Sequence, residues 1–331
     1  MRIFLCLICL IFSACTTQRQ YFNPEKIEAK LSYDEKLSST ITDWNNFSAK
    51  LKNNSVIAKN YADSLNFKLK KGYNLLAYED GEFIVANNDG ILKIYDSIGE
   101  ELYTENFEAS VVSVSTSGDD IALVLANNSI VLANRSLGVK FSYALTATSG
   151  QDSRIAAPIF LDENIIYPSL DGKLIIISRQ DYAIIKNIVV SADYFFNNVI
   201  FLDIIQDKII ATTAKKIIAI TNYEQILYQD ADIKTLAIGE NEIFIFCKDG
   251  NIIKTDFNLK KMAEKKFDFA IFTKANIYND ALYMVEKTGY LIKSDLNLND
   301  FQVFKLEGIE EEMSFMDGDK LYYSNKILNL L

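Results

Sequence analysis

LLAYEDGEFIVANNDGILKIYDSIGEELYTENF, residues 75–107, is the clearest copy of a unit that recurs along the chain. The unit consists of an apolar strand, a polar turn, a second apolar strand, a two-residue turn, a third strand and a looser fourth. Short apolar runs rich in β-branched and aromatic residues, bounded by Asp, Asn and Gly, are typical of strands. Because one such unit cannot cover its own apolar faces, its repetition predicts units that stack on one another.

The copies recur with a period near 40 residues. Clear copies also cover residues 157–190 and 235–267, and weaker ones begin at Val112, Val199, Ala275 and Ser314. Their central turns fall at Asp89-Gly90, Asn128-Ser129, Asp171-Gly172, Lys215-Lys216, Asp249-Gly250, Thr288-Gly289 and Asn325-Lys326, with spacings of 39, 43, 44, 34, 39 and 37 residues. Asp-Gly pairs supply the positive φ that two-residue hairpins require. The pattern predicts an all-β propeller of about seven four-stranded blades over residues 55–331.

Closure of the propeller requires a strand from the N-terminal side. The last copy ends at Leu331 after about three strands, so its fourth strand must come from elsewhere in the chain. Val56–Ala58 and Leu65–Leu69, directly before the first full copy, are the expected donors. Eight blades would result if residues 55–71 contributed more than one strand.

Residues 1–14 have the features of a secretion signal. Arg2 is followed by a short apolar run and by the small residues that precede Cys15. About ten apolar residues are too few for a membrane span, which needs about 20. The segment resembles a bacterial lipoprotein signal, in which the cysteine becomes the lipid-bearing first residue. We therefore expect a secreted chain anchored to a membrane through Cys15.

Residues 15–54 are expected to form a lipidated tether followed by an amphipathic helix. Asn23 and Pro24 are favourable residues for a helix start. Apolar residues then recur with helical spacing, at Ile27, Leu31, Leu37, Ile41, Trp44, Phe47 and Leu51. The helix either docks on the propeller or offers a surface, including Trp44, to another protein.

Composition narrows the possible chemistry. The chain has no histidine, which excludes Ser-His-Asp and Cys-His nucleophile pairs and imidazole metal sites. Only Cys247 remains beyond Cys15, between apolar strand residues, where it is expected to be a buried hydrophobe. A net charge of −10 with no run of Lys and Arg argues against nucleic acid. The acidic pairs lack the spacing of a calcium loop, so we expect no metal and no cofactor.

The repeat resembles a known family. In residues 89–107, Gly90, Asp96, Gly99 and Phe107 occupy the places of the glycine, aspartate, turn glycine and final aromatic of the PQQ-like propeller repeat. Together with the lipoprotein signal, this resembles outer-membrane assembly lipoproteins of the BamB type. The resemblance implies a scaffold within the β-barrel assembly machinery. The repeat tryptophan of that family is absent here, so no partner-binding residues are transferred.

We therefore expect a non-enzymatic, lipid-anchored scaffold that binds envelope proteins and faces the periplasm. Thr16, in place of the aspartate that retains many lipoproteins in the inner membrane, favours the outer membrane. One alternative is a propeller enzyme, either a degraded quinoprotein or a glycosidase or lyase that uses carboxylates and tyrosines. Another is a surface lipoprotein that binds glycans or an adhesion target.

Aromatic and arginine side chains are the best candidates for partner contacts. Tyr194, Phe195 and Phe196 form a cluster in the polar-flanked segment 193–198, between two repeats. The segment is either a contact patch or the outer strand of the fourth blade. Arg154, Arg179 and Trp44 complete the predicted partner-binding set.

Overall fold

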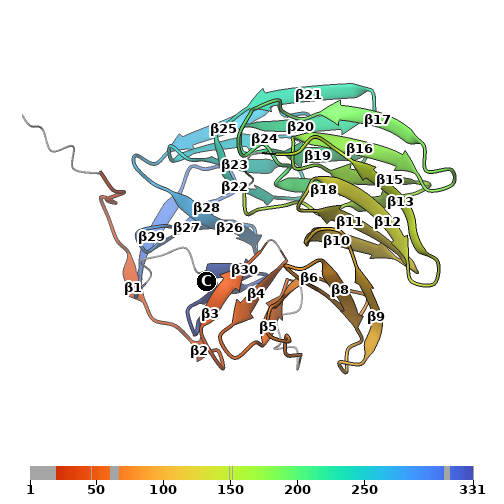
Figure 1. Cartoon of the computed structure of the whole chain (residues 1–331). Helices are drawn as coiled ribbons and strands as arrows, with labels where there is room; N and C mark the ends of the chain where they lie inside the picture. Colours follow the sequence, from red (N-terminus) through yellow and green to blue (C-terminus); the bar gives the residue numbers. More distant parts are fainter. Residues whose placement is uncertain are drawn as a thin grey trace, which may run out of the picture.

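Each repeat folds into an antiparallel sheet in which successive strands are neighbours. The computed structural model describes residues 20–45, 47–59, 67–148, 150, 152–308 and 314–330. Eight such sheets follow one another around a common centre as the blades of a propeller (Figure 1). The all-β propeller is therefore confirmed, with eight blades, the larger of the two numbers considered above.

The chain enters through β1 (Ala29–Leu31) and β2 (Glu35–Lys36) before the first blade begins. Blade 1 contains β3 (Ile41–Trp44), β4 (Ser48–Leu51) and β5 (Val56–Ala58), and blade 2 contains β6 (Tyr73–Glu79), β7 (Glu82–Asn87), β8 (Ile91–Tyr95) and β9 (Glu101–Asn106). Blade 3 contains β10 (Val111–Ser117), β11 (Asp120–Leu125), β12 (Ser129–Asn134) and β13 (Gly138–Ala144), and blade 4 contains β14 (Ile159–Leu161), β15 (Asn164–Pro168), β16 (Lys173–Ser178) and β17 (Ile184–Val189). Blade 5 contains β18 (Phe201–Ile205), β19 (Lys208–Thr212), β20 (Lys216–Thr221) and β21 (Gln225–Asp230), and blade 6 contains β22 (Ile233–Ile238), β23 (Ile243–Cys247), β24 (Asn251–Thr255) and β25 (Lys261–Lys266). Blade 7 contains β26 (Phe272–Tyr278), β27 (Ala281–Glu286), β28 (Tyr290–Asp295) and β29 (Phe301–Leu306), and blade 8 contains β30 (Ser314–Asp317), β31 (Lys320–Tyr323) and β32 (Lys326–Asn329).

The first strand of each blade lies nearest the centre. Contacts join β6 to β10, β10 to β14, β22 to β26, β26 to β30, and β30 to β3. Neighbouring strands of a blade are antiparallel, so the second and fourth strands run in the same direction. The turn after the second strand and the connection that leaves the fourth strand for the next blade therefore lie on the same face. We call this the upper face, and the opposite one the lower face.

Apolar residues fill the spaces between blades. The described residues form eight hydrophobic clusters, one at each junction between neighbouring blades. At the junction of blades 2 and 3, for example, Ile84 and Ile94 pack with Val114 and Leu123, and all four are at most 1% exposed. The second and third strands are buried on both faces, which explains their nearly continuous apolar sequences.

The N-terminal strand β2 completes the last blade. It pairs with β32 in the order β2-β32-β31-β30, with Glu35 opposite Ile327. The prediction that closure comes from the N-terminal side is confirmed, but the donors named above are wrong. Val56–Ala58 is β5 of blade 1, and within Leu65–Leu69 the described Lys68 forms only an isolated bridge with Ser55.

An N-terminal strap, residues 20–36, also covers the outer edge of blade 7. The Phe22 ring lies edge-on against Phe267 and Tyr290, with ring centres 6.0 Å and 5.5 Å apart. Further along, β1 pairs in parallel with β29, and the Glu28 N–H donates to the Val303 carbonyl over 2.8 Å. Blade 7 therefore has a fifth strand (Figure 1).

The amphipathic helix predicted between Pro24 and Leu51 is wrong. The described residues contain no helix, and hence none that could span a membrane. Ala49 and Leu51 are buried in strand β4 against Phe315 and Tyr322 of blade 8. Contacts with residues so distant in sequence override the local spacing, which fits a helix equally well. The predicted signal, residues 1–14, and Cys15 lie outside the described residues.

Cys247 ends β23 and is 7% exposed, as expected for a small buried hydrophobe. Burial raises the pKa of its thiol to about 11, and the negative charges of Asp249 and Asp232 add to the effect. Because the thiolate is the nucleophile, iodoacetamide at about pH 8 should leave Cys247 unmodified in the folded protein and alkylate it in urea. Mass spectrometry of the peptide that contains Cys247 checks this, and rapid labelling of the folded chain would contradict it.

Candidate protein-binding site on the upper face

Three predicted aromatic residues project from a connection between blades 4 and 5. Tyr194, Phe195 and Phe196 are 78%, 57% and 58% exposed, and the rings of Tyr194 and Phe195 meet edge to face at 4.6 Å. The outer strand of blade 4 is β17, which ends at Val189, so the outer-strand interpretation of this segment is wrong. We call residues 193–198 the aromatic loop.

Two buried asparagines hold the aromatic loop to the propeller. The Asn197 amide donates to the carbonyls of Asp171 at 3.1 Å and Ser191 at 2.8 Å. Asn198 accepts a 2.6 Å hydrogen bond from the Asp152 N–H and donates to the Arg154 carbonyl over 2.6 Å. Because Asn197 and Asn198 are only 4% and 0% exposed, the rings are presented from a fixed base.

Gly172, in the central turn of blade 4, makes room for this base. Its φ is 85°, in the left-handed region, and a Cβ there would lie 2.2 Å from the Asn197 amide nitrogen and 2.5 Å from the Ser191 carbonyl oxygen. Only glycine fits both constraints. The Asp171-Gly172 turn was identified from the sequence, but its contact with Asn197 was not, since the two residues lie in different segments.

Arg154 lies beneath this surface as a positioning residue. Its guanidinium forms an ion pair with Asp152 and donates to the Lys234 carbonyl in blade 6 at 2.5 Å. Burial alone would raise the pKa of Asp152, but the hydrogen bonds and charge of Arg154 outweigh it and hold that pKa below its usual value. The Arg154 side chain is only 16% exposed. It stabilises the connection between blades 3 and 4, to which Asn198 is hydrogen-bonded.

The structure separates the other two predicted residues from the aromatic loop. Arg179 lies in the turn between β16 and β17 on the lower face, 3.3 Å from the Asp120 carboxylate and 4.9 Å from the centre of the Phe160 ring. Trp44 ends β3, where the Lys274 amine lies 3.0 Å from the centre of its ring. Both side chains therefore join blades of this chain to one another.

Two curated proteins are similar to this chain in sequence. The chain is 28% identical over 383 aligned positions to plasminogen-binding protein PgbB of Helicobacter pylori strain J99, covering 98% of this chain and 70% of that protein. PgbB of a second strain is likewise 28% identical. No family model matches the sequence, so the PQQ-like repeat stays a prediction.

Among solved structures, BamB from Moraxella catarrhalis superposes with a TM-score of 0.68 and 13% identity, over 88% of this chain and 96% of that one. The chain therefore has a propeller fold similar to that of BamB. The WD40 domain of Sif2 matches nearly as well, with a TM-score of 0.66 and 14% identity over 92% of this chain and 99% of that one. At these identities the likeness concerns the fold alone.

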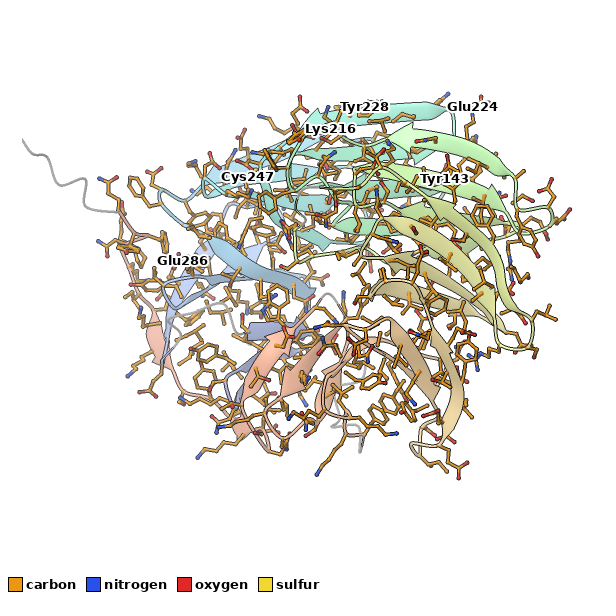
Figure 2. The ribbon with its side chains drawn as sticks, in the orientation of Figure 1. Tyr143, Lys216, Glu224, Tyr228, Cys247 and Glu286 are labelled. Carbon is orange, nitrogen blue, oxygen red and sulfur yellow. The ribbon has the colours of Figure 1, made fainter. Side chains whose placement is uncertain are left out.

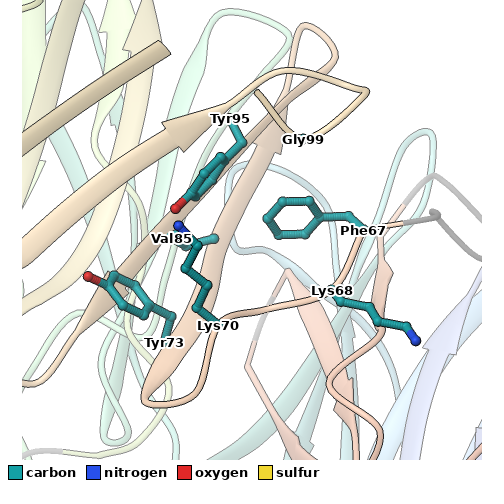
Figure 3. Close-up of a pocket in the computed structure, with 7 residues that line it drawn as sticks. All are labelled: Phe67, Lys68, Lys70, Tyr73, Val85, Tyr95 and Gly99. Carbon is teal, nitrogen blue, oxygen red and sulfur yellow. The ribbon is translucent and has the colours of Figure 1, made fainter. Parts of the chain in front are cut away.

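Two recesses lie away from the aromatic loop. One of about 170 Å³, lined by Tyr73 and Tyr95 among others, has Lys70 pointing between these two rings and Lys68 pointing away (Figure 3). A second, of about 320 Å³, is lined by Tyr21, Phe269 and neighbouring residues. Within the described part of the chain, no group of three His, Cys, Asp or Glu residues is placed to hold a metal ion.

Proposed function

We propose that this chain is a non-enzymatic scaffold of the cell envelope, anchored by lipid at Cys15, that binds a protein through the aromatic loop. The observation that carries the proposal is the set of three exposed rings held on a buried asparagine base. Large aromatic side chains presented rigidly lose little entropy on binding and are typical interface anchors. Its PgbB relatives carry the name plasminogen-binding protein, which supports the same class of function.

Two partners are consistent with these resemblances. The fold shared with BamB favours a role in the assembly of outer-membrane β-barrel proteins, on the periplasmic side. The 28% identity with PgbB over nearly the whole chain favours a surface-displayed protein that binds plasminogen or another extracellular protein. Of the two, we propose the assembly role first, because the predicted lipoprotein signal and the fold similar to that of BamB both support a periplasmic scaffold.

Replacing Tyr194 and Phe195 with serine should reduce capture of the partner by about tenfold or more, because interface aromatics carry much of a binding energy. The measurement is crosslinking in intact cells, followed by affinity purification and quantitative mass spectrometry. The matched control replaces Ile98 and Leu137, which are 80% and 74% exposed on lower-face turns, with serine. Equal loss in both variants would contradict a role for the aromatic loop.

The identity of the captured protein separates the two partners. Recovery of barrel-assembly proteins supports the first, whereas binding of plasminogen by intact cells and cleavage of the chain by external protease support the second. Anchoring has its own test: Cys15→Ala should release the chain from the membrane fraction, and unchanged membrane association would contradict lipidation.

A further inference from the structure

The outer strands of blades 3 to 5 expose apolar side chains at the rim of the propeller. On β17 these are Ile184, Ile185 and Val189, which are 41%, 44% and 45% exposed. No other described strand lies beside the free edge of β17, since blade 4 has the order β14-β15-β16-β17. An exposed, apolar edge strand is a template for pairing with another chain.

Several other rim edges of this propeller are covered or carry more charge, whereas the outer strands β13 and β21 carry one charge each, as β17 does. The edge of β29 is occupied by β1, which pairs Ala29 with Phe304, and blade 8 ends in β2 itself. The outer strand β25 reads KMAEKK, and β9 reads ELYTEN with two glutamates, of which Glu101 is exposed and Glu105 is half-buried. Charged residues on an edge oppose pairing with other strands. In contrast, β17 reads IIKNIV and has a single charge.

The pairing of β1 with β29 shows that an outer strand of this fold accepts an added strand. The added segment is short and extended, and its backbone supplies the contacts, as in the hydrogen bond from Glu28 to Val303. Neither the curvature of the blade nor the neighbouring blades prevent this geometry. The equivalent edge on β17 has the same topological position in its own blade.

Neighbouring blades extend the apolar surface around β17. On β21, Leu227 and Tyr228 are 44% and 52% exposed, and the Tyr228 hydroxyl lies 3.5 Å from the Val189 carbonyl oxygen. Across the other junction, Tyr143 of β13 is 42% exposed. Figure 2 shows Tyr228 and Tyr143 on the outer strands of blades 5 and 3, with blade 4 between them. An added strand would thus contact side chains on both sides.

Lys186, in the middle of β17, indicates the charge of the occupant. It is exposed and forms no ion pair with any residue that the structure describes. In the same region, Lys216 pairs with Asp230 and Lys140 with Asp120. A carboxylate on an added strand is therefore the natural partner of Lys186, because opposite charges on adjacent strands attract.

We propose that the free edge of β17 binds an extended segment of a protein partner by strand addition, with apolar residues at alternate positions and an acidic residue opposite Lys186. This surface deepens the proposed scaffold function and rests on it. The aromatic loop follows β17 directly in the chain, so one partner segment that leaves β17 at Val189 reaches both surfaces.

Amide hydrogen exchange of the full chain tests strand addition. The probe is a short synthetic peptide that alternates valine with threonine and carries one central glutamate. Its excess should slow exchange of the β17 amides by about threefold or more, because added backbone hydrogen bonds protect edge amides. Ile184→Lys with Val189→Lys should abolish this protection. Leu102→Lys, at a 49% exposed position on β9, is the matched control and should retain it.

Two results would overturn the proposal: no protection of β17, or equal protection of β17, β9 and β25, which would indicate unspecific edge binding. A peptide with lysine in place of glutamate should protect β17 less, and equal protection would refute the acidic requirement. Thermal unfolding of the double-lysine variant verifies that it is folded. The peptide could still protect β17 in a protein whose partner capture is unchanged by both the serine variant of the aromatic loop and the double-lysine variant of β17. That result would refute the scaffold function but not strand addition.

Discussion

Replacing Tyr322 with alanine is expected to lower the free energy of unfolding by about 3–5 kcal/mol, the usual cost of deleting a buried aromatic ring. Tyr322 is 1% exposed and belongs to the cluster that joins blade 8 to blade 1, beside Phe315 and Ile57. This junction holds the two ends of the ring together. A cavity there should open the ring as well as weaken the core.

Urea unfolding followed by circular dichroism measures this effect. The matched control is Tyr228→Ala, on an outer strand, where the side chain is 52% exposed and the expected change is below about 1 kcal/mol. Amide exchange should additionally show faster opening of β30–β32 and β3–β5 in Tyr322→Ala. Losses of similar size in the two variants would contradict the importance of the closing junction.

Gly172→Ala is expected to lower the free energy of unfolding by about 3 kcal/mol and to displace the aromatic loop. About 1–2 kcal/mol comes from forcing alanine into the left-handed region, where φ is 85°. The remainder comes from the overlap with Asn197 and Ser191, which breaks at least one buried hydrogen bond of about 1 kcal/mol. Partner capture should fall with it, as in the Tyr194 and Phe195 variants.

Gly81→Ala separates these two contributions. Gly81 also has a positive φ, of 82°, but a Cβ there meets no atom within 4 Å. It should therefore show only the backbone strain and leave partner capture unchanged. Both variants are compared by urea unfolding and by capture of the partner from intact cells. If the two glycines behaved alike, the close approach between Gly172 and the aromatic loop would have no energetic importance.

Both proposed binding surfaces share one arrangement, in which a repeat scaffold carries exposed outer elements. The eight interblade clusters consist of buried apolar residues that fix the strands. Connections and outer strands lie outside these clusters, so they tolerate the exposed rings of the aromatic loop and the apolar edge of β17. Function in such folds is concentrated on elements that the scaffold positions but does not need for its own packing.

The strands of blades 2 to 8 were predictable from the sequence because each hairpin is a local structure. Apolar strands and turns such as Asp89-Gly90 are encoded within a few residues, and all seven predicted central turns fall where the second strand leads into the third. The polar residues on either side of Tyr194, Phe195 and Phe196 also indicate that this segment can form an exposed contact patch. These features depend on residues that are close together in the chain.

The N-terminal strands and the base of the site were decided only by the tertiary structure. Residues 41–51 have a spacing that suits a helix. They become strands because blade 8 buries Ile41, Ala49 and Leu51 on one side, while β4 contacts β6 of blade 2 on the other. The pairing of β2 with β32 joins residues almost 300 positions apart, and no local pattern encodes such a partner. In the same way, Gly172 meets Asn197 only when the central turn of blade 4 and the connection to blade 5 come together on the upper face, because the two residues lie in different segments of the chain.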